Sequence, residues 1–394
     1  MSNTNSKQLA KLAFRFVLII GIVNLFADMA YEGGRSITGP FLGSLGASAT
    51  IVGFVAGFGE LLGYSLRSIS GYFSDKTHRY WIFTFIVYAT NVLAVPALAL
   101  AGNWPLAAAL IIAERTGRAI RKPAVDAMIS YAGKSIGRGW VFGLNEALDQ
   151  AGATISPLIV ALVLYFNGGY RAGFAVLIIP ALLCLATLAV ARIWHPRPHE
   201  MEKRPAHFLA SGGFPKAFWI YVAGGALIAA GFADFSLIAF HFQRAASVAP
   251  NTIPIFYALA MGTSAMTSLL FGRLLGRIGI PIIVVAFLIS AMFAPLVFLG
   301  QFWLALGGMI CWGIGMGAQD SLLKALLTDV VPVTKRSTAF GLFDAGYGIA
   351  WFLGSATMGF LYDTSITALV LLSVVLQLAA LPIFFWGRAM PARR

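Results

Sequence analysis

The stretch from residue 114 to residue 126 concentrates charge in a part of the chain that is otherwise apolar. It reads ERTGRAIRKPAVD, and its charged residues are Glu114, Arg115, Arg118, Arg121, Lys122 and Asp126. It follows directly on the apolar run 104–113, which is typical of the outer half of a membrane-spanning helix. Ionisable side chains at membrane depth are costly and usually mark the path of a substrate or an ion.

The composition is typical of a membrane protein rather than a soluble one. Of its 394 residues, 59% are hydrophobic and 11% are charged, whereas soluble domains average about 25% charged residues. The net charge of +13 does not indicate nucleic-acid binding, because the basic residues lie in loops and set the topology. Cys184 and Cys311 are single residues in separate apolar runs, so neither a disulfide, a metal site nor a cofactor is expected.

The apolar runs predict an all-α membrane protein with twelve transmembrane helices. The polar, basic segment 193–214 is expected to be a cytoplasmic linker between an N-terminal six-helix bundle (1–192) and a C-terminal one (215–394). The expected spans are 16–39, 50–71, 81–101, 104–130, 139–166, 172–192, 215–243, 252–272, 280–300, 302–329, 337–361 and 364–387.

Basic residues are distributed unevenly between the two sets of loops. The loops on the side of the N-terminus carry most of the lysines and arginines, and the opposite loops carry almost none apart from Arg171 and Arg244. By the positive-inside rule, both termini are expected in the cytoplasm. The expected location is therefore a bacterial-type inner membrane, in contact with its lipid bilayer.

The two halves of the chain repeat each other. The motif Arg-x-x-x-Phe-Gly-Leu-x-Glu-Ala that begins at Arg138 recurs at Arg336, 198 residues later, with Asp in place of Glu. The tripeptide Phe-Ala-Asp that ends at Asp28 likewise recurs at Asp234. Six spans in each half give the repeats the same orientation, which is typical of transporters whose halves move about a midplane site.

A loop between the second and third spans adds a more specific feature. It reads Gly71-x-x-x-Asp75-Lys76-x-His78-Arg79 and is similar to the signature loop of the major facilitator superfamily, with His78 in place of the usual second glycine. Together with the spans, the linker and the repeat, the chain resembles this superfamily over nearly its whole length. The resemblance implies two pseudo-symmetric six-helix bundles and alternating access; we expect the protein to function as a monomer.

The signature loop is expected to keep the cytoplasmic side closed when the site faces outward. Asp75 should lie near the start of the eleventh span, where free N–H groups and basic residues form a positive end, and Lys76 and Arg79 belong to the same charged loop.

A second gating element is expected in the cytoplasmic third of the spans. The offset of 198 residues aligns Lys122 with Asp320 and Asp126 with Lys324. Each half thus carries a charge pair with reversed sign order, and repeats of the same orientation bring equivalent positions to equal depth, where the pairs attract each other. Alternatively, each pair is satisfied within its own helix, which the four-residue spacing allows.

Ionisable residues of the first span share one helix face. Asp28, Glu32 and Arg35 are separated by four and three residues, with Tyr31 beside them. Asp28 and Glu32 are candidate proton sites, since burial favours the protonated carboxyl; the alternative is a structural ladder in which Arg35 neutralises Glu32. Glu60 in the second span is expected to serve packing or an ion pair rather than substrate contact.

Arg115 and Arg118 lie near the expected bilayer midplane. The guanidinium fork donates two parallel hydrogen bonds to carboxylate or phosphate, and the superfamily commonly has a functional arginine in this helix. These two residues, with Tyr31 and Arg35, are therefore expected to bind substrate. The first half nevertheless carries seven inward acids and six inward bases, so a mutual network that consumes the cations is the alternative.

The fifth span adds a third candidate for proton coupling. Asp149 is expected to share Arg118 with Asp28. The string GATISP that begins at Gly152 is similar to the antiporter motif of the superfamily, with a serine where glycine is usual. The similarity favours export, although a kink made of small residues and proline gives the same string in any helix.

The second half is poorer in charge. Tyr347 and Trp351 lie one helical turn apart in the eleventh span and are expected to line the substrate cavity, with lipid or core packing as the alternative. The asymmetry favours proton coupling in the first half and substrate selection in the second.

These features favour a secondary active transporter that moves a small organic solute by proton antiport, in the direction of export. An ion gradient, most simply of protons, must drive it, because the sequence has no ATP-binding Walker loop. The alternative within this class is proton-coupled import of an anionic solute such as a polycarboxylate or siderophore. A non-transporting membrane scaffold or sensor is the alternative of another class. An enzyme is not expected, because no nucleophile–base pair or metal-ligand set appears.

Overall fold

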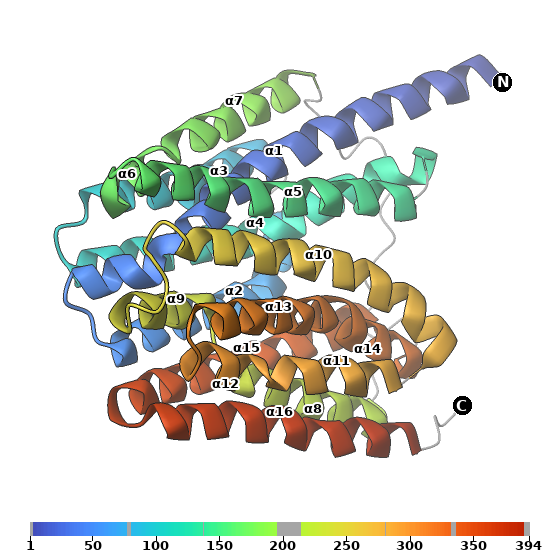
Figure 1. The fold of residues 1–394 in the computed structure, drawn as a ribbon. Helices are drawn as coiled ribbons and strands as arrows, with labels where there is room; N and C mark the ends of the chain where they lie inside the picture. The colour runs from blue at the N-terminus through green and yellow to red at the C-terminus, as the bar shows by residue number, and fades with distance from the viewer. Residues whose placement is uncertain are drawn as a thin grey trace. The chain divides into compact units, whose positions relative to one another are not determined.

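The structure, a computed structural model, is described for residues 3–76, 80–136, 138–194, 214–279, 281–331 and 336–389. The first half of the chain contains α1 (Asn3–Ser44), α2 (Ala49–Lys76), α3 (Tyr80–Ala97), η1 (Leu98–Leu100), α4 (Trp104–Ile136), α5 (Arg138–Tyr165), α6 (Gly169–Ala175) and α7 (Ile178–Trp194) (Figure 1). The second half contains α8 (Lys216–Gly231), α9 (Phe235–Arg244), α10 (Ile253–Ile278), α11 (Pro281–Ala291), α12 (Phe293–Phe298), α13 (Phe302–Ala318), the π-helical η3 (Gln319–Leu323), α14 (Lys324–Val330), α15 (Arg336–Thr364) and α16 (Ile366–Ala389).

Nine helical segments among the described residues are long and apolar enough to cross a membrane. They coincide with nine of the expected spans. The other three expected spans, 81–101, 104–130 and 337–361, are helical too, as α3 with η1, α4 and α15. The protein is therefore a helical, multi-pass membrane protein, while the count of twelve spans stays a prediction.

The seventh expected span is broken between α8 and α9. Asp234 caps α9 by accepting a hydrogen bond from the N–H of Ser236 at 2.8 Å. The carbonyl of Ala233 in the break accepts a hydrogen bond from the indole N–H of Trp312 at 3.0 Å. A broken helix at membrane depth is tolerated where such contacts satisfy its backbone, and this break places the Asp234 carboxylate in the protein interior.

Residue contacts divide the chain into two compact units. Unit 1 comprises Met1–Gly34, Leu66–Ala101 and Leu106–His207, and unit 2 comprises Arg35–Ser65, Gly102–Pro105 and Phe208–Arg394. The C-terminal part of α1 and the N-terminal part of α2 are therefore grouped with the second repeat. The division into bundles 1–192 and 215–394 about a linker stays a prediction.

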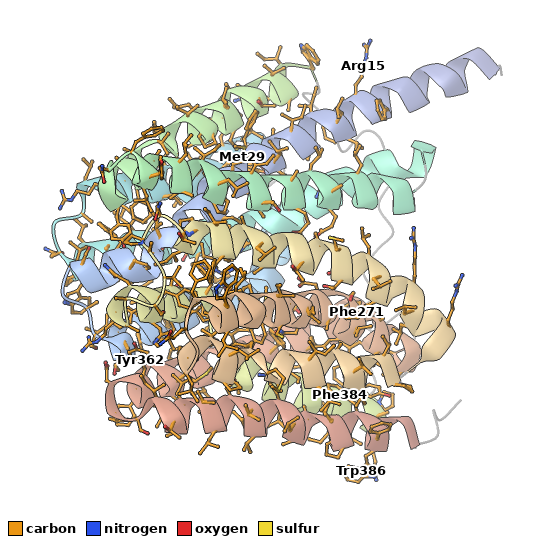
Figure 2. The ribbon with its side chains drawn as sticks, viewed as in Figure 1. Arg15, Met29, Phe271, Tyr362, Phe384 and Trp386 are labelled. Atoms are coloured by element: carbon orange, nitrogen blue, oxygen red, sulfur yellow. The ribbon has the colours of Figure 1, made fainter. Side chains whose placement is uncertain are left out.

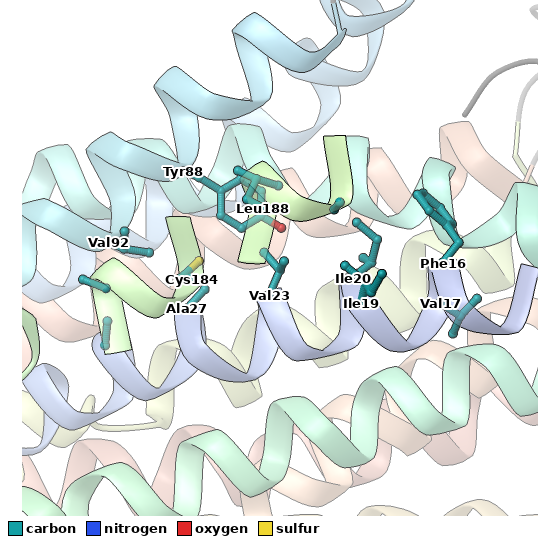
Figure 3. Packing of buried hydrophobic residues seen from close by; sticks show 13 residues of the cluster. Phe16, Val17, Ile19, Ile20, Val23, Ala27, Tyr88, Val92, Cys184 and Leu188 are labelled. Carbon is teal, nitrogen blue, oxygen red and sulfur yellow. The ribbon is translucent and has the colours of Figure 1, made fainter. Parts of the chain in front are cut away.

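The core of unit 1 forms where α1, α3 and α7 meet. Phe16, Ile20 and Val23 lie at helical spacing on α1 and belong to one apolar cluster with Tyr88 of α3 and Leu188 of α7 (Figure 3). All five side chains are fully buried. This packing fixes α1 against α3 and α7, so the polar residues that follow on α1 are held inside the unit.

The core of unit 2 forms between helices of the second repeat. There α8 packs against α15 and α16, and α10 packs against α13. On α16, Phe384 is fully buried, whereas Trp386, two residues later, is 62% exposed (Figure 2). Large apolar side chains remain exposed on many of the described helices, as a surface in contact with lipid requires.

Candidate substrate and proton site

Three arginines of α4 form ion pairs inside unit 1. The pairs, each with its nitrogen–oxygen distance, are Arg121–Asp28 at 3.0 Å, Arg118–Glu32 at 3.7 Å and Arg115–Glu114 at 3.5 Å. All three acids are buried. The three arginines are thus each neutralised by an acid, as in the mutual network that the sequence offers as an alternative.

Tyr31 connects two of these pairs. Its hydroxyl accepts a hydrogen bond from Arg115, and the centre of its ring lies 3.8 Å from the guanidinium carbon of Arg118. A cation over an aromatic face gains about 0.5–2 kcal/mol. The side chain of Arg118 is 23% exposed, against 5% for Arg115 and 6% for Arg121. Arg118 is therefore the most accessible of the three arginines to a solute.

A chain of hydrogen bonds leads to Asp149. The Tyr88 hydroxyl donates to Asn24 at 2.9 Å, and the Asn24 amide donates to Asn145 at 2.8 Å. The Asn145 amide in turn donates to Asp149 Oδ2 at 3.2 Å. Because the guanidinium carbon of Arg121 lies 5.0 Å from the centre of the Tyr88 ring, the chain connects Asp149 with the Arg121 ion pair.

The pairing of Asp28 corrects the sequence-based expectation. The prediction that Asp28 and Asp149 share Arg118 is wrong for Asp28, whose partner is Arg121. Arg118 and Arg121 lie one turn apart on α4, so they point in similar directions at different depths. The depth of α1 against α4 selects between them, and residue spacing within either helix does not specify that depth.

Three neutral residues of the network were missed by sequence reasoning. Asn24 and Tyr88 form the chain described above, and Asn91 donates to the Glu114 carboxylate at 2.9 Å. All three are buried. An amide inside an apolar span signals an interior partner, because a polar group there is rarely left to face lipid, but it does not indicate which partner.

The remaining predicted substrate residues lie in unit 2. Arg35 Nη2 is 2.6 Å from Asp234 Oδ2 and 3.4 Å from Glu60 Oε1. Glu60 therefore takes part in an ion pair, as predicted. Substrate binding by Arg35 stays a prediction.

Tyr347 and Trp351 belong to an aromatic cluster of unit 2. Ring centres are 5.8 Å apart between Tyr347 and Trp351, 5.2 Å between Tyr347 and Tyr64, and 5.7 Å between Trp351 and Phe232. The Tyr347 hydroxyl donates to Gln319. The two residues are 5% and 3% exposed, which agrees with the packing alternative, and their contact with substrate stays a prediction.

The predicted gating residues fall mostly outside the described side chains. Those not described are Asp75, Lys76, Arg79, Lys122, Asp126 and Lys324. Asp320 is exposed and lies in the π-helical segment η3, a type of turn that is frequent at functional sites. Both gates stay predictions. Among the described residues, no group of three or more His, Cys, Asp or Glu side chains is arranged to hold a metal ion.

The chain belongs to the Major Facilitator Superfamily, whose family model matches residues 20–355 and 235–394. An uncharacterized protein of Mycobacterium tuberculosis is 38% identical over 392 residues, which cover 98% of this chain and 96% of the relative. An uncharacterized MFS-type transporter of Methanocaldococcus jannaschii is 26% identical over 379 residues, which cover 92% of each chain.

A solved structure supports the same fold. The nucleoside transporter NupG matches with a TM-score of 0.73 at 13% identity, covering 94% of this chain and 100% of that one. Family and fold together identify a multi-pass transporter rather than an enzyme, and they confirm the resemblance seen in the signature loop and the repeats.

Proposed function

We propose that the protein is a proton-coupled antiporter that exports a small organic solute across a bacterial-type inner membrane. The observation that supports the proposal is an imbalance of charge in unit 1. Its described interior holds the carboxylates of Asp28, Glu32, Glu114 and Asp149 and the guanidinium groups of Arg115, Arg118 and Arg121. Among these described groups the carboxylates outnumber the guanidinium groups by one, and a proton taken up by one carboxyl group removes that difference, which is costly at membrane depth.

Asp149 is the carboxyl group best suited to take that proton. Its Oδ2 accepts a hydrogen bond from the neutral amide of Asn145 at 3.2 Å. A neutral amide can donate to a carboxyl in either charge state. Asp149 can therefore keep this hydrogen bond when it gains or loses a proton.

The same excess charge explains why exchange is favoured over cotransport. Either a proton or a positively charged group of the solute neutralises it. Two ligands that compensate for the same charge weaken each other's binding, so that they occupy the protein alternately. We therefore expect the exported solute to be a cationic organic molecule.

The exchange can be tested in everted membrane vesicles that respiration has acidified. A panel of organic amines and quaternary ammonium compounds is added outside, and a fluorescent dye reports the internal pH. A transported compound should dissipate the gradient in vesicles that contain the protein and leave control vesicles unaffected. Asp149→Asn should abolish this response.

Glu146→Gln is the matched control, because Glu146 lies on the same helix three residues earlier but is exposed. It should retain the response. A full response in Asp149→Asn vesicles would contradict the assignment of Asp149. If the unaltered protein is folded and no compound of the panel dissipates the gradient, antiport of cationic solutes is contradicted.

Import of an anionic solute is the second candidate, and the exposure of Arg118 favours it. The 23% exposed guanidinium over Tyr31 could exchange Glu32 for the carboxylate of a solute. In right-side-out vesicles, an inward proton gradient should then drive uptake of radiolabelled citrate. Arg118→Gln should abolish that uptake, whereas no uptake by the unaltered protein would leave export as the supported direction.

A further inference from the structure

We infer that the contact between the N-terminal part of α2 and α15 in unit 2 is poised to open, because it buries two hydrogen-bond donors of α15, Trp351 and Ser355, that have no partner among the described residues. The inference goes beyond the proposed exchange at Asp149. It concerns residues of unit 2 and holds for any solute or coupling ion.

The contact between α2 and α15 is close over several turns. A Cβ atom added at Gly57 would lie 2.8 Å from the Cβ of Ser355, and one added at Gly53 would meet the Ser355 carbonyl oxygen. Two turns further along α2, the ring centre of Tyr64 lies 5.2 Å from that of Tyr347. Glycine at positions 53 and 57 lets the helices approach so closely that the groups between them are kept from water.

Two polar groups of α15 are buried at this contact. Ser355 is 1% exposed and Trp351 is 3% exposed. Neither the Ser355 hydroxyl nor the Trp351 indole N–H has a hydrogen-bond partner among the residues that the structure describes. Because residues four apart are neighbours along one helix face, Trp351 lies between Tyr347 and Ser355, which both touch α2. Both groups thus belong to the stretch of α15 that packs on α2.

A second buried tryptophan of the same aromatic cluster is bonded. The ring centres of Trp312 and Trp351 lie 5.3 and 5.7 Å from that of Phe232. The N–H of Trp312 donates to the Ala233 carbonyl at 3.0 Å, whereas that of Trp351 meets no acceptor in the described part of the chain. The cluster therefore satisfies one indole and leaves the other unsatisfied.

Buried hydroxyl groups show the same contrast. Ser373 of α16 is fully buried, and its hydroxyl donates to the Gly231 carbonyl at 2.6 Å. On α15 itself, the hydroxyl of Thr357 donates to the carbonyl of Leu353, one turn earlier, at 2.7 Å. Ser355 makes neither kind of bond within the described structure. Its burial therefore has a cost in free energy that the burial of Ser373 does not have.

Opening the contact removes this cost. A donor buried without a partner has lost its hydrogen bond to water and gained none, so it destabilises the closed contact relative to an open one that water enters. Other groups hold the contact closed, among them Asp363 of α15, whose carboxylate accepts hydrogen bonds from the first turn of α2. The helices α2 and α15 belong to different sequence repeats, and such repeats move against each other in transporters of this topology. Ser355 and Trp351 therefore lower the free energy needed to part the two helices.

Removing the unpartnered hydroxyl should stabilise the protein. Ser355→Ala should raise the unfolding temperature, measured by scanning fluorimetry in detergent, because a buried donor without a partner is lost. Ser373→Ala is the matched control, since it brings the same gain in helix propensity but removes the hydrogen bond to Gly231, and it should lower the unfolding temperature. An unchanged or lowered unfolding temperature for Ser355→Ala, or equal shifts in the two variants, would overturn the inference.

The two tryptophans provide an independent pair of variants. Trp351→Phe and Trp312→Phe remove the same ring volume, but only Trp312→Phe breaks a hydrogen bond. Trp351→Phe should therefore cause the smaller fall in unfolding temperature. Equal falls, or a larger fall for Trp351→Phe, would contradict an unpartnered N–H at Trp351.

The opening itself can be followed with pyrene labels on Ser48→Cys and Thr364→Cys, in a background in which both native cysteines are replaced by alanine. Position 48 precedes α2 and position 364 ends α15, next to the hydrogen bonds of Asp363, so two pyrenes form an excimer when the contact is closed. Adding Ser355→Ala should raise the ratio of excimer to monomer emission several-fold, whereas adding Ser373→Ala should leave it unchanged. A ratio that Ser355→Ala does not raise would overturn the link between the unpartnered hydroxyl and the opening of the contact.

Discussion

Units 1 and 2 stabilise their polar interiors in different ways, although most of each unit comes from one of two related sequence repeats. In unit 1, Arg115, Arg118 and Arg121 each have an acid of their own. In the described interior of unit 2, Arg35 serves two carboxylates, and aromatic rings occupy much of the remaining space. Unit 1 therefore depends on charge pairing, and unit 2 depends more on close packing.

The repeat-related residues Asp28 and Asp234 show where this difference arises. Asp28 lies inside the continuous helix α1, whose backbone N–H groups are already bonded, so its charge needs Arg121. Asp234 follows a break between helices and accepts a backbone N–H from Ser236 in addition to Arg35. A sequence repeat thus preserves a residue and its place in the fold, while the local backbone determines its partner.

The largest effect should follow from removing a charge partner in unit 1. Arg121→Gln leaves Asp28 buried without its cation, and we expect it to cost about 3–5 kcal/mol. Arg118→Gln also removes a cation from a buried acid, but its pair is longer and its guanidinium is partly exposed, so its cost should be smaller. Thermal unfolding followed by scanning fluorimetry in detergent provides the comparison.

A double variant keeps this prediction testable. Arg121→Gln with Asp28→Asn replaces the buried ion pair by two amides, and it should unfold at a higher temperature than Arg121→Gln alone. Equal losses for the Arg121 and Arg118 variants would mean that charge pairing does not distinguish unit 1.

The next largest effect should come from the close packing of unit 2. A Cβ atom added at Gly57 of α2 would lie 2.8 Å from Ser355 Cβ and 3.1 Å from the backbone of Phe352 on α15. Gly57→Ala should therefore destabilise the protein by about 1–3 kcal/mol. The measured quantity is the shift in the unfolding temperature.

Gly262→Ala on α10 is the matched control, because an added Cβ there meets nothing within 4 Å. It should be neutral or stabilising by up to about 1 kcal/mol, since alanine favours helix. Similar shifts in unfolding temperature for the two glycine variants would contradict the claim that unit 2 depends on close packing between its helices.

The helices themselves could be predicted from the sequence, because a span depends on local hydropathy. Each of the twelve expected spans is largely helical in the described residues, although the break between α8 and α9 in the seventh was not expected. The family could be predicted too, since the signature loop and the repeats are linear patterns. Glu60 in an ion pair was also anticipated, although its partner Arg35 on α1 was not.

The partners could not be predicted, because they depend on the depth of one helix against another. Gly152 of α5 lies against the backbone of Leu25 on α1, and Gly117 of α4 lies against Asn91 on α3. Such contacts fix the positions of α1 and α4 along their own axes. At these positions Arg121, rather than Arg118, lies beside Asp28. Spacing within one helix carries no information on that offset.

Two buried tyrosines allow the two units to be compared through the loss of a single hydrogen bond in each. Tyr88→Phe removes the donor to Asn24 in unit 1, and Tyr347→Phe removes the donor to Gln319 in unit 2. Each should cost about 1 kcal/mol, because a buried acceptor loses its hydrogen bond. Infrared difference spectroscopy during a pH titration can follow the carbonyl stretch of the protonated Asp149 carboxyl group. Only Tyr88→Phe should alter that signal, because the chain of hydrogen bonds to Asp149 starts at Tyr88. An equal change in both variants would show that the chain does not influence Asp149.

The smallest effect concerns Asp363, an exposed residue of unit 2 beyond the expected end of the eleventh span. Its carboxylate accepts hydrogen bonds from the N–H and hydroxyl of Thr50, at 2.9 and 2.7 Å, and from the N–H of Ala49 at 3.3 Å. These groups form the N-terminal turn of α2, where a negative charge is favourable. Partial burial would raise the pKa of Asp363, but the hydrogen bonds outweigh it and hold the pKa below its ordinary value.

A lowered pKa in the folded state gives a stabilising contribution that is present above the ordinary pKa of about 3.9 and is lost as the pH falls through the folded value. Asp363→Asn should therefore lower the unfolding temperature slightly at neutral pH. The difference from the unaltered protein should shrink towards zero in acid, because both side chains are then neutral. Unfolding temperatures measured from neutral to acidic pH provide the test. A difference that stays constant over this range would show that packing, rather than the charge of Asp363 at the start of α2, joins α15 to α2 in unit 2.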